Sequence, residues 1–173
     1  MSTANIPTLE LRNLEVSYTV RGIDRQVLRD VSLSIAPGEA YGLVGESGCG
    51  KSTAAFAAMR YLPRNGKITA GSILFEGKNI VDIGEGDVAN LRRSAISMVY
   101  QNPATALNPT IRIGKQIAEV FELNGASKTD ALEMAQAALT RVQISDPAQV
   151  MRRYAHQLSG GMAQRVVIAM ALA

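Results

Sequence analysis

A short glycine-rich segment carries the residue types and spacing in this chain that could do chemistry. Residues 45–52 are Gly-Glu-Ser-Gly-Cys-Gly-Lys-Ser, which satisfies the spacing Gly-x-x-x-x-Gly-Lys-Ser. Glycines let the backbone curve so that its amides converge on an anion. A helix that follows adds free amides and the positive end of its dipole. The segment predicts a phosphate-binding loop.

Individual side chains of this loop have separate expected roles. Lys51 can reach the β- and γ-phosphates of a nucleotide, and the Ser52 hydroxyl can coordinate a bridging Mg²⁺. Thr53 is a candidate contact to the α-phosphate. The alternative is a glycine-rich turn with an exposed lysine, and the predicted strand-loop-helix context argues against it. The expected nucleotide-contacting residues are Gly45, Glu46, Ser47, Gly48, Cys49, Gly50, Lys51, Ser52 and Thr53.

The elements around the loop follow from hydrophobic patterning. Apolar residues alternate over 9–16, with one slip, and over 27–35, which predicts half-buried antiparallel strands. The apolar run 40–44 predicts a strand buried on both faces, directly before the loop. Small and apolar residues from Lys51 to about Leu62 suit a helix that Pro63 ends.

The rest of the chain is predicted to become helical after residue 101. A short strand pair at 72–75 and 79–81 and an apolar strand at 96–100 come first. Side-chain oxygens at Thr110 or Ser127 are candidate helix caps. The predicted helices span 113–123, 129–142 and 162–173.

Composition restricts the classes of function. The 173 residues are 47% hydrophobic, enough for a globular domain with its own core. The net charge of +3 comes without runs of like charge, so nucleic-acid binding is not indicated. No apolar stretch approaches the length of a membrane span, and the N-terminus lacks the pattern of a secretory signal. The single cysteine, Cys49, excludes an internal disulfide.

A second motif, residues 158–165 (Leu-Ser-Gly-Gly-Met-Ala-Gln-Arg), resembles the signature sequence of ATP-binding cassette (ABC) proteins. Its distance from the glycine loop fits that family. An ordinary capped helix start is the alternative interpretation, and the pairing with the glycine loop argues against it. The segment from Tyr100 to Pro109, with Ile113-Gly114 and Gln116-Ile117 beyond it, resembles the dipeptide, oligopeptide and nickel importer branch.

The resemblance implies an α/β fold: a P-loop NTPase cassette of the ABC type, incomplete, with an N-terminal antiparallel β subdomain and an α-helical subdomain. On this basis residues 1–101 form the nucleotide-binding core and residues 102–157 the helical subdomain. Residues 158–173 form the signature and its helix. The family continues with a magnesium-binding aspartate and a catalytic glutamate that these 173 residues lack. We therefore expect the chain to bind ATP and to hydrolyse it poorly.

Site residues are also implied by the resemblance. Tyr18 would stack on adenine, although a packed aromatic is the alternative. Gln101 would sense Mg²⁺ and the γ-phosphate, acting with Lys51 in catalysis and with Ser52 at the metal. The signature residues would cap the γ-phosphate held by the opposite subunit, with ATP and Mg²⁺ as cofactors. These signature residues are Ser159, Gly160 and Gly161.

The implied partners are a second ABC ATPase subunit, in a head-to-tail homo- or heterodimer, and membrane-embedded permease subunits that the helical subdomain contacts. An extracytoplasmic solute-binding protein would act indirectly. The expected location is peripheral, on the cytoplasmic face of the inner membrane. His156 is interpreted as structural, because the family's switch histidine belongs to a later segment. Cys49, at a helix start, is either a reactive thiol or an inert small residue.

The leading hypothesis is an ATP-binding subunit that couples ATP binding and hydrolysis to import of peptides or related small solutes. A soluble ABC ATPase of DNA repair or translation is a second hypothesis, although no coiled-coil or tandem-cassette insertion is visible. A binding-only, truncated cassette is a third. A small-molecule kinase is least favoured, because it has no use for the signature.

Overall fold

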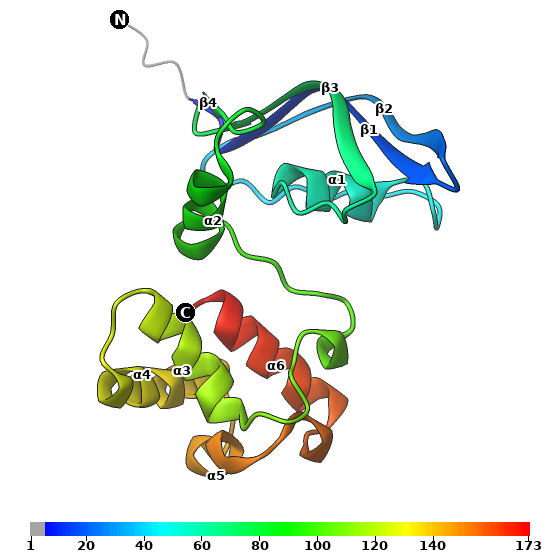
Figure 1. Cartoon of the computed structure of the whole chain (residues 1–173). Coiled ribbons are helices and arrows are strands. Elements are labelled where there is room, and N and C mark those ends of the chain that lie inside the picture. Colours follow the sequence, from blue (N-terminus) through cyan, green and yellow to red (C-terminus); the bar gives the residue numbers. More distant parts are fainter. Residues whose placement is uncertain (1–5) are drawn as a thin grey trace, which may run out of the picture. The chain divides into compact units, whose positions relative to one another are not determined.

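The computed structural model describes residues 6–173, which divide into two compact units between Asn90 and Leu91. The first unit holds a sheet and one complete helix, and the second is helical (Figure 1). The boundaries predicted at 101/102 and 157/158 stay predictions.

An antiparallel sheet forms most of the first unit. Its strands are β1 (Leu9–Val20), β2 (Ile23–Ile35), β3 (Gly66–Phe75) and β4 (Lys78–Asn79), in the order β2-β1-β3-β4. Every neighbouring pair is antiparallel, as the alternating patterns predict. The turn between β3 and β4 lies at residues 76–77, between the two strands predicted at 72–75 and 79–81.

The slip in the β1 pattern corresponds to a bulge. Asn13 and Asp30 have φ of 47° and 49°, and the β1–β2 register shifts between Leu11 and Leu14. Asn13 Nδ2 donates to Asp30 Oδ1 at 2.6 Å, which ties the two irregular positions together. Because the bulge inserts an extra residue, both leucines face the core, with 2% and 0% of their surface exposed.

Helix α1 (Lys51–Ala58) packs on β1 and β2 and follows the glycine loop, as predicted. Its small residues Ala54, Ala57 and Ala58 are buried, which allows the helix to approach the sheet closely. The helix ends earlier than the predicted position near Leu62. Met59 caps it, and Arg60 adopts a left-handed conformation with φ of 53°.

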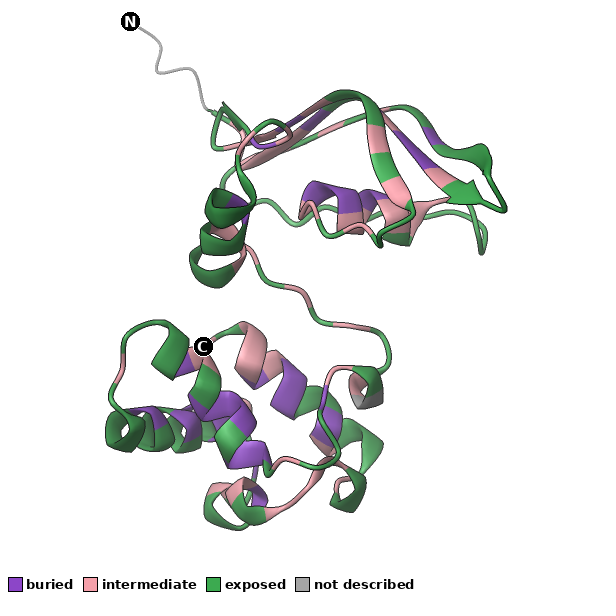
Figure 2. Cartoon of the chain, viewed as in Figure 1, coloured by how far each residue is buried: buried purple, intermediate pink, exposed green. Residues whose placement is uncertain are grey.

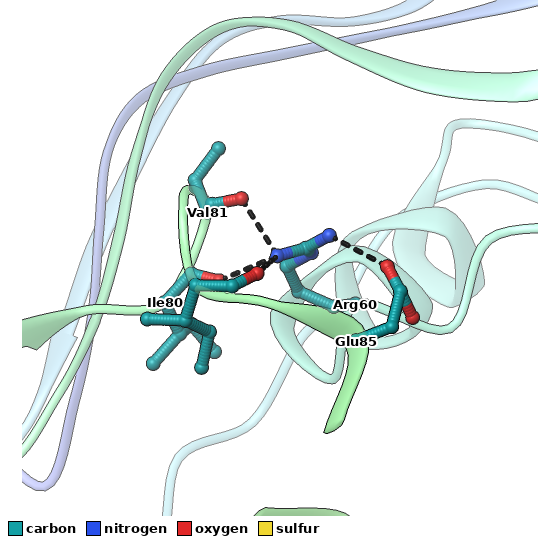
Figure 3. Close-up of polar contacts among 5 residues, drawn as sticks. Arg60, Ile80, Val81 and Glu85 are labelled. Atoms are coloured by element: carbon teal, nitrogen blue, oxygen red, sulfur yellow. Dashed lines mark hydrogen bonds and ion pairs between the residues drawn. The ribbon is translucent and has the colours of Figure 1, made fainter. Parts of the chain in front are cut away.

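The Arg60 side chain explains this early end. Its Nη1 donates to the carbonyl oxygens of Ile80, Val81 and Ile83 at 2.9, 2.7 and 3.0 Å. Its Nη2 contacts Glu85 Oε1 at 3.0 Å, at the start of helix α2 (Glu85–Ser94) (Figure 3). Only 18% of the side chain is exposed. The guanidinium thus joins the end of α1 to the segment that follows the sheet.

Replacing Arg60 with alanine is expected to destabilise the protein by about 1–3 kcal/mol, because three backbone carbonyls lose a charged donor. Thermal or urea unfolding of the chain measures the effect. Arg64→Ala, at an exposed arginine four residues later, is the control and should change stability by less than about 0.5 kcal/mol. Equal unfolding curves for the two variants would contradict a stabilising role of Arg60.

Two predicted strands are absent, so those predictions are wrong for this chain. Residues 40–44 and 96–100 have no regular structure, and Val44 is 97% exposed. A strand buried on both faces needs hydrogen-bonding neighbours on each side and helices over both faces. Within residues 6–173 every ladder partner belongs to the antiparallel sheet. Residues 40–44 and 96–100 are therefore apolar segments that do not form strands in this structure.

Helices form the second unit around one core. The core consists of buried residues on α3, α4 and α6 and of residues from the segments that connect the helices (Figure 2). Its largest fully buried side chains include Ile113, Ile117, Leu139 and Val166. The helical elements are η1 (Pro103–Thr105), α3 (Ile113–Leu123), α4 (Lys128–Arg141), α5 (Pro147–Arg152), η2 (Ala155–Gln157) and α6 (Gly160–Ala171).

The predicted helices of this unit are present, with small shifts at α4 and α6. Ser127 caps α4, because its Oγ accepts a hydrogen bond from Asp130 N at 3.2 Å. Thr110 is not a helix cap. Its hydroxyl donates to Asn108 Oδ1 at 2.7 Å, and Arg112 occupies the N-cap position of α3. Among the described residues, no helix combines the length and apolar character needed to cross a bilayer.

Candidate functional site

The glycine loop ends in a helix start that only glycine can form. Gly50 is the N-cap of α1 with φ of 99°, and Gly48 has φ of 84°. A Cβ at Gly50 would lie 2.8 Å from Leu28 Cδ2, and one at Gly45 would lie 2.9 Å from Cys49 Sγ. A side chain at Gly50 would clash with Leu28 of β2, and one at Gly48 or Gly50 would strain the backbone.

The first amides of α1 are available to a ligand. Ala54 N is the first to bond within the helix, to Gly50 O at 2.9 Å. The N-cap Gly50 offers no side-chain acceptor, so the amides of Lys51, Ser52 and Thr53 lack intrahelical partners. Three free amides and the positive end of the helix dipole suit a phosphate.

Lys51 adds the cation of this site. Its Nζ donates to Gly45 O at 2.8 Å and to Glu46 O at 2.6 Å, and lies 3.5 Å from Cys49 Sγ. The Lys51 ammonium group is therefore hydrogen-bonded to the backbone of the glycine loop. Ser52 is exposed beside it. Its hydroxyl is an oxygen ligand of the kind that Mg²⁺ takes together with phosphate oxygens and waters, so these residues fit a magnesium-bound nucleotide.

The signature segment forms a second helix start, in the second unit. Ser159 is the N-cap of α6, and its Oγ accepts from Met162 N at 3.3 Å. The amides of Gly160 and Gly161 precede the first intrahelical bond and stay available. A Cβ at either glycine would meet no heavy atom within 4 Å. The fold itself does not require glycine at these two positions.

Two further predicted site residues have less specific surroundings. Gln101 is exposed in the second unit. Tyr18, in the first unit, is half-buried on β1 opposite Gly66, where an added Cβ would lie 2.7 Å from Tyr18 Cε1. Close packing of the ring on Gly66 accounts for part of its burial.

The family model described as "ABC transporter" matches residues 28–173, which include both motifs. This match covers most of the chain. The chain belongs to the ABC transporter family. Its fold is the ABC ATPase cassette, with the antiparallel sheet and helical unit predicted from the resemblance.

Curated relatives of this cassette are peptide transport ATP-binding proteins. It is 42% identical over 166 residues to the dipeptide transport ATP-binding protein DppD of Bacillus subtilis, covering 95% of this chain and 50% of that protein. It is 42% identical over 165 residues to the oligopeptide transport ATP-binding protein OppD of Salmonella typhimurium, covering 95% and 49%. The chain thus spans about half the length of the curated relatives it matches.

Solved cassettes share the fold. The dimeric structure of MJ0796, a bacterial ABC transporter cassette, matches with a TM-score of 0.81 and 25% identity over 95% of this chain and 68% of that one. A dimeric, post-hydrolysis form of the same cassette, bound to ADP and phosphate, gives the same values. This relative therefore forms a dimer and binds ADP and phosphate in the post-hydrolysis form.

The burial of Gln116 on α3 was not predicted from the sequence. It is 6% exposed, and its Nε2 donates to the carbonyl oxygens of Asn108 and Ile111 at 3.0 and 2.7 Å. Its Oε1 accepts from Asn108 N at 2.8 Å. These bonds hold the turn before α3. A glutamine at an inward position between Ile113 and Ile117 is the sequence signal that could have indicated it.

Proposed function

We propose that this ABC cassette is part of the ATP-binding subunit of an importer, coupling ATP binding and hydrolysis to uptake of peptides or related small solutes. The glycine loop supports this proposal most directly, because its open amides, Lys51 and Ser52 fit the phosphates and magnesium of ATP. The names of the peptide-transport relatives support the class of solute.

In this proposal each predicted site residue has its own role in nucleotide binding. Residues 45–53 bind the triphosphate, with Lys51 at the β- and γ-phosphates and Ser52 at Mg²⁺. Tyr18 stacks on adenine through the part of its ring that Gly66 does not cover. Gln101 senses Mg²⁺ and the γ-phosphate. Bound Mg²⁺ supplies charge neutralisation between the phosphates.

The signature acts on a second nucleotide-binding subunit. Ser159, Gly160 and Gly161 cap the γ-phosphate of ATP held by the opposite subunit, in a head-to-tail homo- or heterodimer. The dimeric cassettes among the solved relatives support this arrangement. The helical subdomain contacts membrane-embedded permease subunits at the cytoplasmic face of the membrane. A solute-binding protein outside the membrane acts through the permease.

Titration of the 173-residue chain with ATP, with and without Mg²⁺, tests the nucleotide site, and steady phosphate release tests turnover. The expected result is Mg²⁺-dependent binding in the range of tens of micromolar, about 6 kcal/mol, with negligible turnover. The native protein with its permease is then assayed for ATPase stimulation by peptide. Absence of ATP binding would overturn the proposal. A native protein that binds ATP without turnover or permease contact would favour the binding-only hypothesis.

Cys49 offers a chemical test of where ATP binds. The thiol is free and exposed within the loop. Bound phosphates would cover it, so Mg-ATP is expected to slow alkylation of Cys49 by iodoacetamide about 10-fold at saturation. Mass spectrometry of the alkylated fraction over time measures the rate. AMP, which lacks the β- and γ-phosphates, is the control ligand. Equal rates with ATP and AMP would contradict phosphate binding at this loop.

A further inference from the structure

The helix that offers its first amides to phosphate has a second fixed point at its other end. Helix α1 begins at the glycine loop, and Arg60 follows its last residue, Ala58, by two positions. The helix has eight residues, so its two ends lie about 12 Å apart at a rise of about 1.5 Å per residue. Such a short helix moves as one piece, and a shift at Arg60 displaces the phosphate-binding amides.

The packing of α1 on the sheet does not by itself fix the helix along its axis. The buried residues of α1 are Ala54, Ala57 and Ala58. An alanine side chain ends at Cβ, so this face offers no long side chain that interlocks with the strands. The alanines set how closely the helix approaches the sheet, and its axial position needs another contact.

The backbone at the end of α1 would suit glycine better than arginine. Arg60 N donates to Ala57 O and Tyr61 N donates to Phe56 O, each at 2.8 Å. With the φ of 53° at Arg60, these bonds form a Schellman motif, in which the left-handed residue is usually glycine. An arginine here departs from the local preference, so its side chain, and not its backbone, accounts for its presence.

The Arg60 side chain ties α1 to a segment that is itself held by the sheet. Figure 3 shows the guanidinium directed at the carbonyl oxygens of Ile80 and Val81, with Ile83 O also within 3.0 Å. Ile80 is 3% exposed, and its N donates to Ile73 O of β3 at 2.8 Å. These acceptors lie outside α1, so the dipole of α1 does not account for the bonds. Arg60 therefore anchors the far end of the helix to the sheet.

We propose that Arg60 is a positioning residue for nucleotide binding, which fixes α1 from its far end and couples the glycine loop to residues 80–85. This inference rests on the proposed ATP site and adds a residue outside the loop that sets its affinity. A binding site must be held within about 0.5 Å of its productive geometry. Because coupling between two sites is reciprocal, nucleotide at the loop in turn orders residues 80–85.

Calorimetric titration of the 173-residue chain with Mg-ATP tests the effect of Arg60 on the loop. Arg60→Gly suits the left-handed backbone, so α1 can end as before while the guanidinium is lost. Its expected effect is about 10-fold weaker Mg-ATP binding, within the range of about 5- to 150-fold that coupled sites show. Arg64→Gly, at an exposed arginine, is the matched control and keeps wild-type affinity. Circular dichroism checks that both variants are folded at the temperature of the titration.

Hydrogen exchange measured by mass spectrometry tests the coupling itself, with a readout that a purely stabilising residue would not change. In the wild type, saturating Mg-ATP is expected to slow amide exchange at residues 45–53 and also at residues 80–88. In Arg60→Gly, saturating Mg-ATP should still protect residues 45–53 and should no longer protect residues 80–88. Arg64→Gly should retain protection of both segments.

The outcomes separate this inference from the proposed function. If Arg60→Gly is folded and binds Mg-ATP as tightly as the wild type, Arg60 only stabilises the fold and the inference fails, while the nucleotide site stands. If Mg-ATP protects residues 45–53 of the wild type but not residues 80–88, the coupling does not exist and the inference fails. If the wild type binds no Mg-ATP, the proposed function and the inference both fail.

Discussion

Replacing Lys51 with alanine is expected to weaken Mg-ATP binding by about 10- to 100-fold. Its ammonium group lies along the loop, 2.8 and 2.6 Å from two loop carbonyl oxygens. Bound phosphates would receive the same donor, and a hydrogen bond to a charged group contributes about 1.5–3 kcal/mol. The measurement is calorimetric titration of the chain with Mg-ATP. In the native protein, steady phosphate release should fall at least in proportion.

The control must separate loss of the loop cation from loss of any lysine. Lys67 lies on β3 in the same unit, where its ammonium donates to Asp24 Oδ2 at 2.5 Å and lowers the pKa of that carboxyl. Lys67→Ala removes an exposed ion pair and should leave ATP affinity unchanged. If Lys51→Ala binds Mg-ATP as tightly as Lys67→Ala does, the loop is not the nucleotide site.

The sequence correctly predicted the helices and strands whose hydrogen-bonding partners lie within the same segment or on an adjacent strand. Helix α3 spans the predicted residues because its apolar spacing and its core contacts agree. Of the two cap candidates, Ser127 caps a helix and Thr110 does not, because the Ser127 hydroxyl satisfies a first-turn amide from within its own segment. The slip in the pattern at Asn13 is a real bulge. In each case the required partner lies nearby in sequence or on an adjacent strand.

Features that depend on distant partners could not be predicted. The apolar run at 40–44 fits a strand, but composition does not reveal whether a neighbouring strand exists to pair with it. The early end of α1 depends on Arg60 and carbonyl groups twenty or more residues later. Helix α5 was missed although Asp146-Pro147 is a typical helix start. Its six residues were too few to show a hydrophobic period.

The two parts of the candidate site also differ in whether the local backbone conformation requires their glycines. The glycine loop was predictable because its backbone conformations are local, and Gly48 and Gly50 have the positive φ that only glycine adopts readily. The glycines of the signature are a different case. Neither Gly160 nor Gly161 has a positive φ, and neither touches a neighbour that a methyl group would displace. The fold would accept alanine at both positions.

Gly161→Ala is therefore expected to keep or slightly raise stability while lowering ATP hydrolysis by the proposed dimer about 100-fold. Alanine favours a helix over glycine by up to about 1 kcal/mol, so unfolding should not explain a loss of activity. In the proposed dimer a methyl group would occupy space needed by the γ-phosphate of the opposite subunit, and loss of one such donor contact typically costs about 100-fold or more. ATP binding by the isolated chain should be unchanged.

A matched glycine distinguishes this effect from a general one. Gly86 lies in α2, has no positive φ, and would also place a Cβ in open space. Gly86→Ala should gain the same helix preference and retain wild-type hydrolysis. Thermal unfolding, ATP titration and phosphate release are measured for both variants. Full hydrolysis by Gly161→Ala would show that the open space above the signature is not used by nucleotide. Activity would then have to be explained without a phosphate contact at the start of α6.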